Sequence, residues 1–284
     1  MAAEPRITVY TNLFTLASKE PATNRYVEMF FIWLSYLIRK GRPAAAYLMI
    51  DSRTFSYVAS TPLFAALSAK LTFPMYALTY DPPATLKEGT LRRFEVERLV
   101  PLAERRVFFY LDVDVLPIRP LSGLIAEFKP NCLYYAAESI PTESKLVFLD
   151  KNYFGHLATA EDAAWLETRF AETGAPGMTS GIFGFTAGER IGDFFKYIRD
   201  QAAADSAKQF YTLDQPYYAA AIYRFIMRDG LIDNVGLDPA HIGVNIPSYQ
   251  APTTKILLNF CGDPGDESSH WFKMFTELIL DAAF

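Results

Sequence analysis

The chain has few of the residues that build disulfide-rich or zinc-binding proteins. Its 284 residues include two cysteines, Cys132 and Cys261, and three histidines, at positions 156, 241 and 270. Two cysteines cannot form a disulfide framework, and no cleavable signal is recognised at the N-terminus, so we expect a cytoplasmic protein. The histidines are not spaced as metal ligands, and no Cys/His cluster indicates zinc.

Long hydrophobic runs and an excess of basic residues are also absent. The longest apolar run, residues 26–38, contains Glu28 and is shorter than the roughly 20 residues that span a bilayer. We therefore expect a buried helix there and no transmembrane segment, which leaves only peripheral contact with a membrane open. The net charge of -5 and the pI of about 5.3 argue against a nucleic-acid partner, because phosphate binding needs a basic face.

The chain does have apolar material for a large core, since 51% of its residues are hydrophobic. In the first half, strand patterns alternate with helix patterns. The predicted strands are residues 7–10, 45–50, 71–80 and a segment that begins at Arg106, and the predicted helices are 24–40, 62–70 and 86–102. This alternation is typical of βαβ units, so residues 1–120 are predicted to form a Rossmann-like nucleotide-binding half.

The second half continues with a looser alternation. Its predicted strands are residues 132–137, 181–186 and 255–260, and its predicted helices are 160–173, 189–204, 214–227 and 271–280. Asp214, with Pro216 close behind it, is typical of a helix N-terminus. No repeat, low-complexity tract or linker interrupts the chain, so we expect one α/β domain over residues 1–284, with a mostly parallel central sheet flanked by helices.

No G-x-G-x-x-G or Walker loop follows the first strand, so another group must neutralise bound phosphates. Asp112 and Asp114 follow the apolar strand that begins at Arg106. Alternate side chains of a strand point the same way, so both carboxylates should project from its carboxyl end, where open α/β sheets bind ligands. Such a pair can hold Mn²⁺ or Mg²⁺, and the ion can hold a diphosphate. The simpler alternative is a solvated pair in a strand-end turn.

Several short motifs occur in the order found in glycogenin-like glycosyltransferases of the GT-A fold. Leu111 to Asp114, followed by Leu116 and Pro120-Leu121, resembles the family's Y-L-D-x-D…P-L segment. The other matching segments are Thr11-Asn12, Arg93 with Leu99-Val100-Pro101, Thr179 to Phe183, Asp214-Gln215, and Asn259 to Gly262 with Lys273. The resemblance covers nearly the whole chain and rests on the ordered set rather than on any single motif.

The resemblance implies metal-dependent, retaining transfer of a hexose from a nucleotide-sugar, usually a UDP-sugar, to a carbohydrate or glycoconjugate acceptor. Residues 121–284 would form the acceptor-binding half. Asp112, Asp114 and Asn259 would bind Mn²⁺ or Mg²⁺, and Asp214 and Gln215 would line the reacting face. The donor-binding residues implied are Thr11, Asn12, Arg93, Asp112, Ser180 and Lys273.

The chain departs from the family pattern at two of these positions. Asn259 stands where the family has a histidine ligand, and an amide oxygen binds manganese more weakly than imidazole does. His270 is the alternative third ligand. Thr179 stands where the family has an asparagine that contacts the sugar. For retention we favour attack from the face that the leaving phosphate occupies, because the sequence places no second acid beside Asp214.

Plainer structural roles are open for several of the same residues. Asp214 could be a helix N-cap, Arg93 could lie on a solvated helix face, and Lys273 could be a surface lysine. Trp271, Phe272 and Phe275 are predicted to be mostly core.

Two rival functions also fit the sequence. The first is a haloacid-dehalogenase-type phosphatase, in which Asp112 would be the nucleophile and Asp114 the general acid; Gly262 to Asp266 imitates the late acidic motif of that class. Against it, three predicted βα units precede the aspartates. The second rival is a degenerate nucleotide-sugar-binding protein that lost turnover together with the family's histidine.

Overall fold

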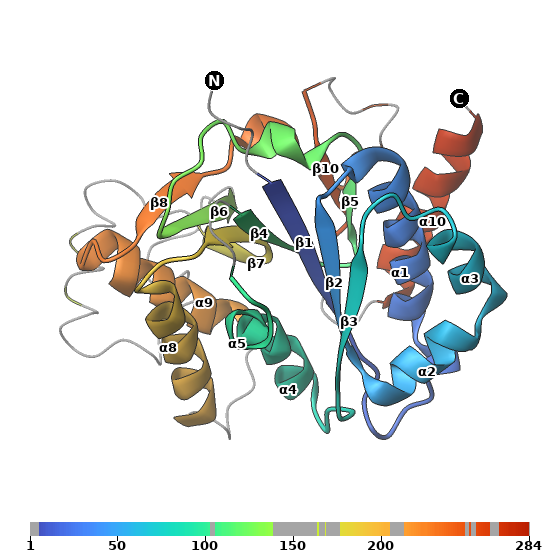
Figure 1. Cartoon of the computed structure of the whole chain (residues 1–284), viewed down its shortest axis with the longest axis horizontal. Helices are drawn as coiled ribbons and strands as arrows, with labels where there is room; N and C mark the ends of the chain where they lie inside the picture. Colours follow the sequence, from blue (N-terminus) through green and yellow to red (C-terminus); the bar gives the residue numbers. More distant parts are fainter. Residues whose placement is uncertain are drawn as a thin grey trace.

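The computed structural model of the chain describes residues 6–102, 106–138, 177–204, 213–247, 254–261 and 267–283, together with the single residues 164, 168 and 250. Within these ranges a main sheet of seven strands lies beside a small sheet of three (Figure 1). The main sheet contains, in spatial order, β3 (Met75–Tyr80), β2 (Ala45–Asp51), β1 (Arg6–Leu13), β4 (Arg106–Leu111), β7 (Gly177–Thr186), β6 (Cys132–Glu138) and β8 (Asp233–Gly236). The small sheet contains β5 (Val115–Pro117), β10 (Leu257–Asn259) and β9 (Ile242–Val244).

Helices lie on both sides of the main sheet (Figure 1). The α-helices described are α1 (Arg25–Tyr36), α2 (Ser52–Ser60), α3 (Pro62–Ser68), α4 (Leu86–Leu91), α5 (Val96–Leu99), α8 (Ile191–Ala204), α9 (Gln215–Ile222) and α10 (Glu267–Ala283). Short 3-10 turns cover Pro21–Thr23, Arg92–Glu95, Leu121–Leu124 and Pro239–His241, and π-helical turns cover Leu37–Gly41 and Tyr223–Arg228.

The main sheet is mostly parallel, as predicted. β1 pairs in parallel with β2 and β4, and β2 pairs in parallel with β3. β7 is inserted antiparallel between β4 and β6, and β6 pairs in parallel with β8. Strands from both halves of the chain therefore belong to one sheet, and β7 brings a late segment of the sequence beside the end of β4.

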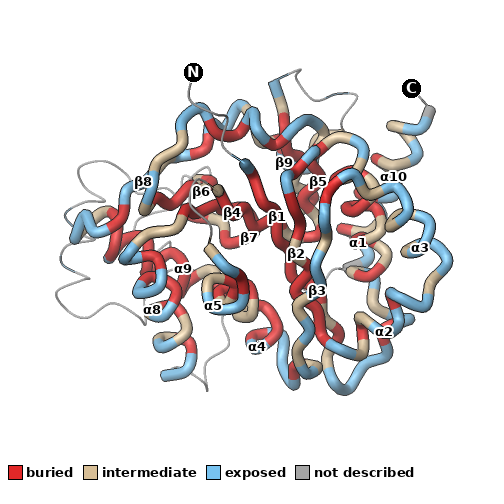
Figure 2. Tube along the Cα trace, in the orientation of Figure 1, coloured by how far each residue is buried: buried red, intermediate tan, exposed pale blue. Residues whose placement is uncertain are grey.

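The central strands are buried on both faces because helices cover both. In β4, Phe109 and Leu111 belong to the apolar cluster that contains α1, whereas Phe108 and Tyr110 belong to the cluster that contains α8 and α9. Figure 2 shows this buried centre, with the exposed positions on the outer helices and loops. A continuous apolar run such as Val107 to Leu111 is typical of a strand covered on both sides.

Most of the predicted elements in the described ranges are present, with shifted ends. The predicted helix 24–40 is α1 followed by a π-helical turn, and the predicted helix 214–227 is α9 followed by another. The predicted helix 271–280 starts earlier, at Glu267. The predicted helix 160–173 lies outside the described residues, apart from 164 and 168.

Helix 86–102 is wrong as a single element. It is divided into α4, a 3-10 turn and α5. The break contains Arg93, whose side chain is buried and whose Nε donates to the carbonyl of Thr90 at 3.1 Å. The local helix therefore gives way to a burial that an amphipathic pattern does not reveal.

Helix α2 was not predicted, although its start signal is in the sequence. Asp51 ends β2, and its Oδ1 accepts hydrogen bonds from the backbone N–H groups of Arg53 and Thr54. This is N-terminal capping by an aspartate. The sequence reading treated Asp51-Ser52 as the end of a strand only.

Close packing across β4 and β7 gives a test of the register. A Cβ at Gly184 would lie 2.6 Å from Cδ2 of the buried Phe109 ring. We expect Gly184→Ala to lower the free energy of unfolding by about 1–3 kcal/mol, measured by urea denaturation. Gly192→Ala is the control, because nothing lies within 4 Å of its added Cβ, and it should change stability by less than about 1 kcal/mol. Equal effects of the two substitutions would contradict the register.

Candidate active site

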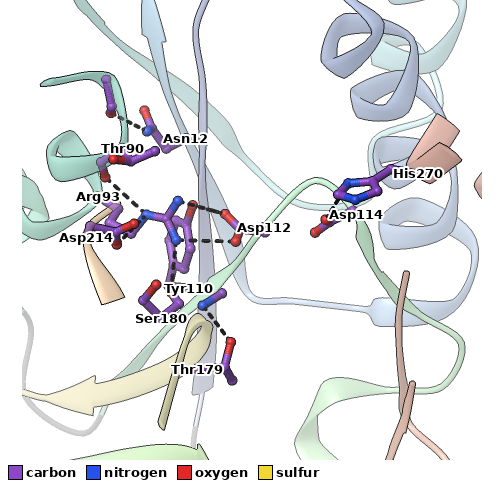
Figure 3. A network of polar contacts seen from close by, with 12 residues as sticks. Asn12, Thr90, Arg93, Tyr110, Asp112, Asp114, Thr179, Ser180, Asp214 and His270 are labelled. Atoms are coloured by element: carbon purple, nitrogen blue, oxygen red, sulfur yellow. Dashed lines mark hydrogen bonds and ion pairs between the residues drawn. The ribbon is translucent and has the colours of Figure 1, made fainter. Parts of the chain in front are cut away.

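The Asp112–Asp114 segment is a turn rather than a continuation of the strand. β4 ends at Leu111, and the N–H of Val115 donates to the carbonyl of Asp112 at 3.0 Å. The prediction that both carboxylates project side by side from one strand is therefore wrong. The physical reason is β5, which leaves the main sheet at Val115 to pair with β10. Asp112 faces Arg93, and Asp114 faces His270 (Figure 3).

Arg93 is the centre of the larger group of contacts. Its guanidinium lies 3.2 and 3.3 Å from the two oxygens of Asp112 and 3.5 Å from Oδ2 of Asp214. It also donates to the carbonyl of Ser180 at 3.0 Å. The residue is only 6% exposed, so the solvated-helix alternative is wrong. One cation thus joins α4, the end of β4, β7 and the start of α9.

Two neighbours hold the Asp112 carboxylate against Arg93. The Tyr110 hydroxyl donates to Oδ1 of Asp112, and the Arg93 guanidinium lies over the Tyr110 ring at 4.7 Å from its centroid. Gly181 lies on the other side, where an added Cβ would be 2.7 Å from Oδ2 of Asp112. Glycine is needed at position 181 because the carboxylate occupies the space of a side chain.

Asp214 precedes α9 but does not cap it. Its side chain makes no capping hydrogen bond, and its backbone carbonyl accepts from Tyr217 and Tyr218 instead. The carboxylate is buried, paired with Arg93 and hydrogen-bonded to Ser180. The alternative of a simple N-cap is therefore wrong. Gln215, the first residue of α9, is partly exposed beside it.

The electrostatic state of the site reflects burial and charge together. Burial raises the pKa of Asp112 to about 7; Arg93 opposes this rise, and the nearby Asp114 adds to it. Burial also raises the pKa of Asp214, against the lowering effects of Arg93 and of the Ser180 hydrogen bond. Burial alone would lower the pKa of Arg93, but Asp112 and then Asp214 raise it above its ordinary value.

Thr11 and Asn12 lie on opposite sides of β1. Asn12 is near the Arg93 group, where its amide donates to the carbonyl of Gly89 and accepts from the Tyr80 hydroxyl, at 2.8 and 2.7 Å. Both polar ends of the side chain thus link β1 to α4 and β3. Thr11 is fully buried, and alternation along the strand directs its side chain to the other face of the sheet. The structure does not bring Thr11 to the site.

Asp114 belongs to a second, smaller group. His270 Nδ1 lies 3.4 Å from its Oδ2, and the N–H of Phe260 donates to its backbone carbonyl at 3.0 Å. Asn259 pairs in register with Val115, so it is next to this turn. Lys273 lies one turn beyond His270 on α10, where its Nζ donates to the side chain of Asn245 and to the carbonyl of Cys261.

The described carboxylates do not form a closed metal site. Across the described ranges no three Cys, His, Asp or Glu side chains come together as metal ligands. Asp112 and Asp114 are nevertheless close enough for Asp114 to raise the pKa of Asp112. An oxygen-rich pair of this kind fits an ion such as Mg²⁺ or Mn²⁺, which typically takes one or two carboxylates and completes its shell with substrate phosphates and water.

Two residues of the site were not picked out from the sequence. Tyr110 precedes Asp112 by two positions, and the alternation of the strand could have identified it as a neighbour. Lys87 is 9% exposed, and its Nζ lies 4.9 Å from the centroid of the Tyr217 ring. No local motif marks it, because its position depends on the packing of α4 against α9.

Comparisons with known proteins identify a fold rather than a family. No family model matches the chain, and no curated protein matches it. Among solved structures, the chain is similar to the apo structure of WbbM, a bifunctional glycosyltransferase, with a TM-score of 0.61 at 12% sequence identity. The match covers 98% of this chain but only 50% of that chain. The chain therefore has a glycosyltransferase-like α/β fold and spans about half the length of the protein it matches.

Removing the central cation should show how much the site depends on it. We expect Arg93→Met to lower the free energy of unfolding at pH 8 by about 3–5 kcal/mol, because two buried carboxylates lose their partner. Without Arg93 the folded-state pKa values of Asp112 and Asp214 rise further. Stability from a carboxyl group with a raised pKa is present at low pH and lost as pH rises through that pKa. The defect should therefore shrink between pH 8 and pH 5.5 in urea titrations.

The control is Arg92→Met, one residue away. Arg92 is more exposed and pairs with Glu88 and Glu95, so its loss should cost less than about 1 kcal/mol. A defect in Arg93→Met that is the same at both pH values would contradict the assigned pairing.

Proposed function

We propose that the chain is a glycosyltransferase that moves a hexose from a nucleotide-sugar, most simply a UDP-sugar, to a carbohydrate or glycoconjugate acceptor. The observation that carries the proposal is the joining of Asp112 and Asp214 by Arg93 at the carboxyl edge of the sheet, beside Asp114. The similarity to a solved glycosyltransferase supports the same class of reaction. Open α/β sheets bind ligands at this edge.

In this proposal Asp112 and Asp114 hold the metal ion, and Asn259 or His270 completes the set. Bound Mn²⁺ or Mg²⁺ supplies Lewis-acid stabilisation of the negative charge that forms on the departing diphosphate. Arg93 keeps the Asp112 carboxylate in a fixed position through contacts with both of its oxygens. Ser180 and Asn12 border the same edge, and Lys273 adds positive charge on the Asp114 side.

Retention is proposed to proceed by attack from the face that the leaving phosphate occupies. The alternative requires a carboxylate that attacks the sugar from the opposite face. Asp214 is only 3% exposed and is engaged by Arg93 and Ser180, so it is poorly placed to form a covalent bond. We assign Asp214 and Gln215 to shaping the reacting face.

No structural observation favours the phosphatase alternative. Both oxygens of Asp112 contact Arg93, which leaves the carboxylate poorly available as a nucleophile. Its proposed late acidic motif, residues 262–266, lies outside the described residues. A donor-binding protein without turnover differs from the proposal only in activity, so the experiment below distinguishes the two.

A screen of nucleotide-sugars tests the proposal directly. We expect Mn²⁺-dependent release of nucleotide from one donor class, which is lost with excess chelator. Asp114→Asn should lower this rate at least about 100-fold while the far-UV circular dichroism stays unchanged. Asp193→Asn is the control, because Asp193 is an exposed residue of α8 that pairs only with Arg190 among the contacts described. An active Asp114→Asn enzyme would contradict the metal role, and metal-dependent binding without turnover would favour the binding protein.

The position of Asp112 can be tested without removing its charge. Gly181→Ala places a Cβ 2.7 Å from the carboxylate, so Asp112 must move. Misplacement of a reacting group by about 1 Å can cost about 100-fold in rate, so we expect kcat to fall by about 10- to 100-fold. Gly192→Ala should leave kcat unchanged. A Gly181→Ala variant with normal kcat would mean that the Asp112 carboxylate does not act in the reaction.

A further inference from the structure

Helix α10 has its apolar and charged residues on unexpected sides. Phe272, Phe275 and Ile279 are 64%, 39% and 53% exposed, whereas Glu277 is 1% exposed and His270 is also buried. The prediction that the aromatic residues of this segment are mostly core is therefore wrong. A surface helix normally directs its apolar residues toward the core and its charged residues toward water.

The three exposed residues form one continuous surface, called here the exposed stripe. Their spacings of three and four residues place them on one face of the helix. Trp271 extends the stripe, because its ring stacks on Phe275 with centroids 5.0 Å apart. The charged residues Lys273, Glu277 and Asp281 occupy other faces of the helix.

Contacts with α1 hold the helix in this orientation. α10 lies along α1 at one side of the molecule (Figure 1). Asp281 pairs with Arg39 at 3.0 Å and with Lys40 at 3.5 Å, and the Arg25 guanidinium lies 4.8 Å from the centroid of the Trp271 ring. These contacts fix the inner side of α10, so the helix cannot turn its stripe inward without breaking them.

The same contacts give the stripe a basic border. Arg25, Arg39 and Lys40 are all 40% exposed or more, and we call them the basic flank. Arg39 and Lys40 share the single carboxylate of Asp281, which leaves one positive charge in excess there. The flank is therefore positive on a chain whose net charge is -5.

We propose that the exposed stripe and the basic flank lie on an anionic lipid surface. Aromatic and aliphatic side chains beside Arg and Lys are typical of helices that lie in the interface of a membrane, where apolar burial and attraction to acidic headgroups act together. No helix in the described ranges is long and apolar enough to cross a membrane. The contact is thus one of lying on the surface.

A second copy of the chain fits this surface less well. Pairing about a two-fold axis places the same patch against itself, so each basic flank would meet the flank of its partner. Like charges across an interface oppose association. An acidic lipid surface is instead complementary to the flank along its whole length.

The proposed contact places the candidate site close to the lipid. His270 contacts Asp114 from the inner side of the same helix that carries the stripe. The surface would lie about one helix diameter, roughly 10 Å, from Asp114. The lipid contact itself does not depend on the proposed reaction, and it can be tested without activity.

Vesicle flotation of the full chain tests the proposal. We expect binding to vesicles of phosphatidylcholine mixed with phosphatidylglycerol, weaker binding to phosphatidylcholine alone, and weakening by salt. The pair Phe272→Gln and Ile279→Gln should lower the partition constant at least about ten-fold. Leu99→Gln on α5 is the matched control, since Leu99 is a similarly exposed apolar residue on another element, and it should bind as the parent does.

The charge requirement has its own matched pair. Lys40→Gln should weaken binding to the acidic vesicles about five-fold. Lys196→Gln, on the exposed side of α8, should have no effect. A folded parent protein that stays unbound with both kinds of vesicle, or a Phe272/Ile279 variant that binds as well as the parent, would overturn the proposal. So would a dimer, seen by light scattering, that the same pair of substitutions removes.

Discussion

The structure depends at its functional edge on one buried cation between two carboxylates. Arg93 contacts Asp112 after β4 and Asp214 before α9, and it also reaches the Ser180 carbonyl on β7. These segments are far apart in the sequence. A buried charge is costly unless it is paired and hydrogen-bonded, so this arrangement forms only when all its members are in place. The helix break around Arg93, the glycine at position 181 and the uncapped Asp214 are all consequences of the same requirement.

The parallel sheet places these groups at one edge, and the turn after β4 separates them into two. Asp112 remains with Arg93, and Asp114 turns toward α10 and the small sheet. The two aspartates thus connect the nucleotide-binding half to a helix from the end of the sequence. The turn is possible because β5 joins β10 instead of extending β4. Its geometry explains why two acids one residue apart interact with different partners and still influence each other's ionisation.

Local patterns predict the parts of this fold that local physics determines. The apolar strands, their alternation with helices and the acidic end of β4 follow from residue type and spacing. The role of Arg93 does not, because its spacing on α4 is equally typical of a solvated helix face, and only the approach of Asp214 from the second half buries it. Asp214 shows the reverse error: its position before Pro216 is typical of a cap, but its carboxylate is drawn to Arg93. For α10 the pattern is misleading, since an aromatic stripe is most often core, and here the pairing of Asp281 with Arg39 and Lys40 directs it outward.

The charges at the edge bear on how a nucleotide-sugar could bind there. Among the described residues, Asp112, Asp114 and Asp214 bring three acids, and Arg93 is already shared by two of them. A diphosphate approaching this edge would meet a surface with too little positive charge, and like charges in a poorly hydrated site repel strongly. Under the proposed function, the donor must therefore arrive with a divalent cation or find one already between Asp112 and Asp114. Neutralisation of these two acids would also remove the repulsion that raises the pKa of Asp112. Donor binding and metal binding should then strengthen each other, because each supplies the charge that the other lacks.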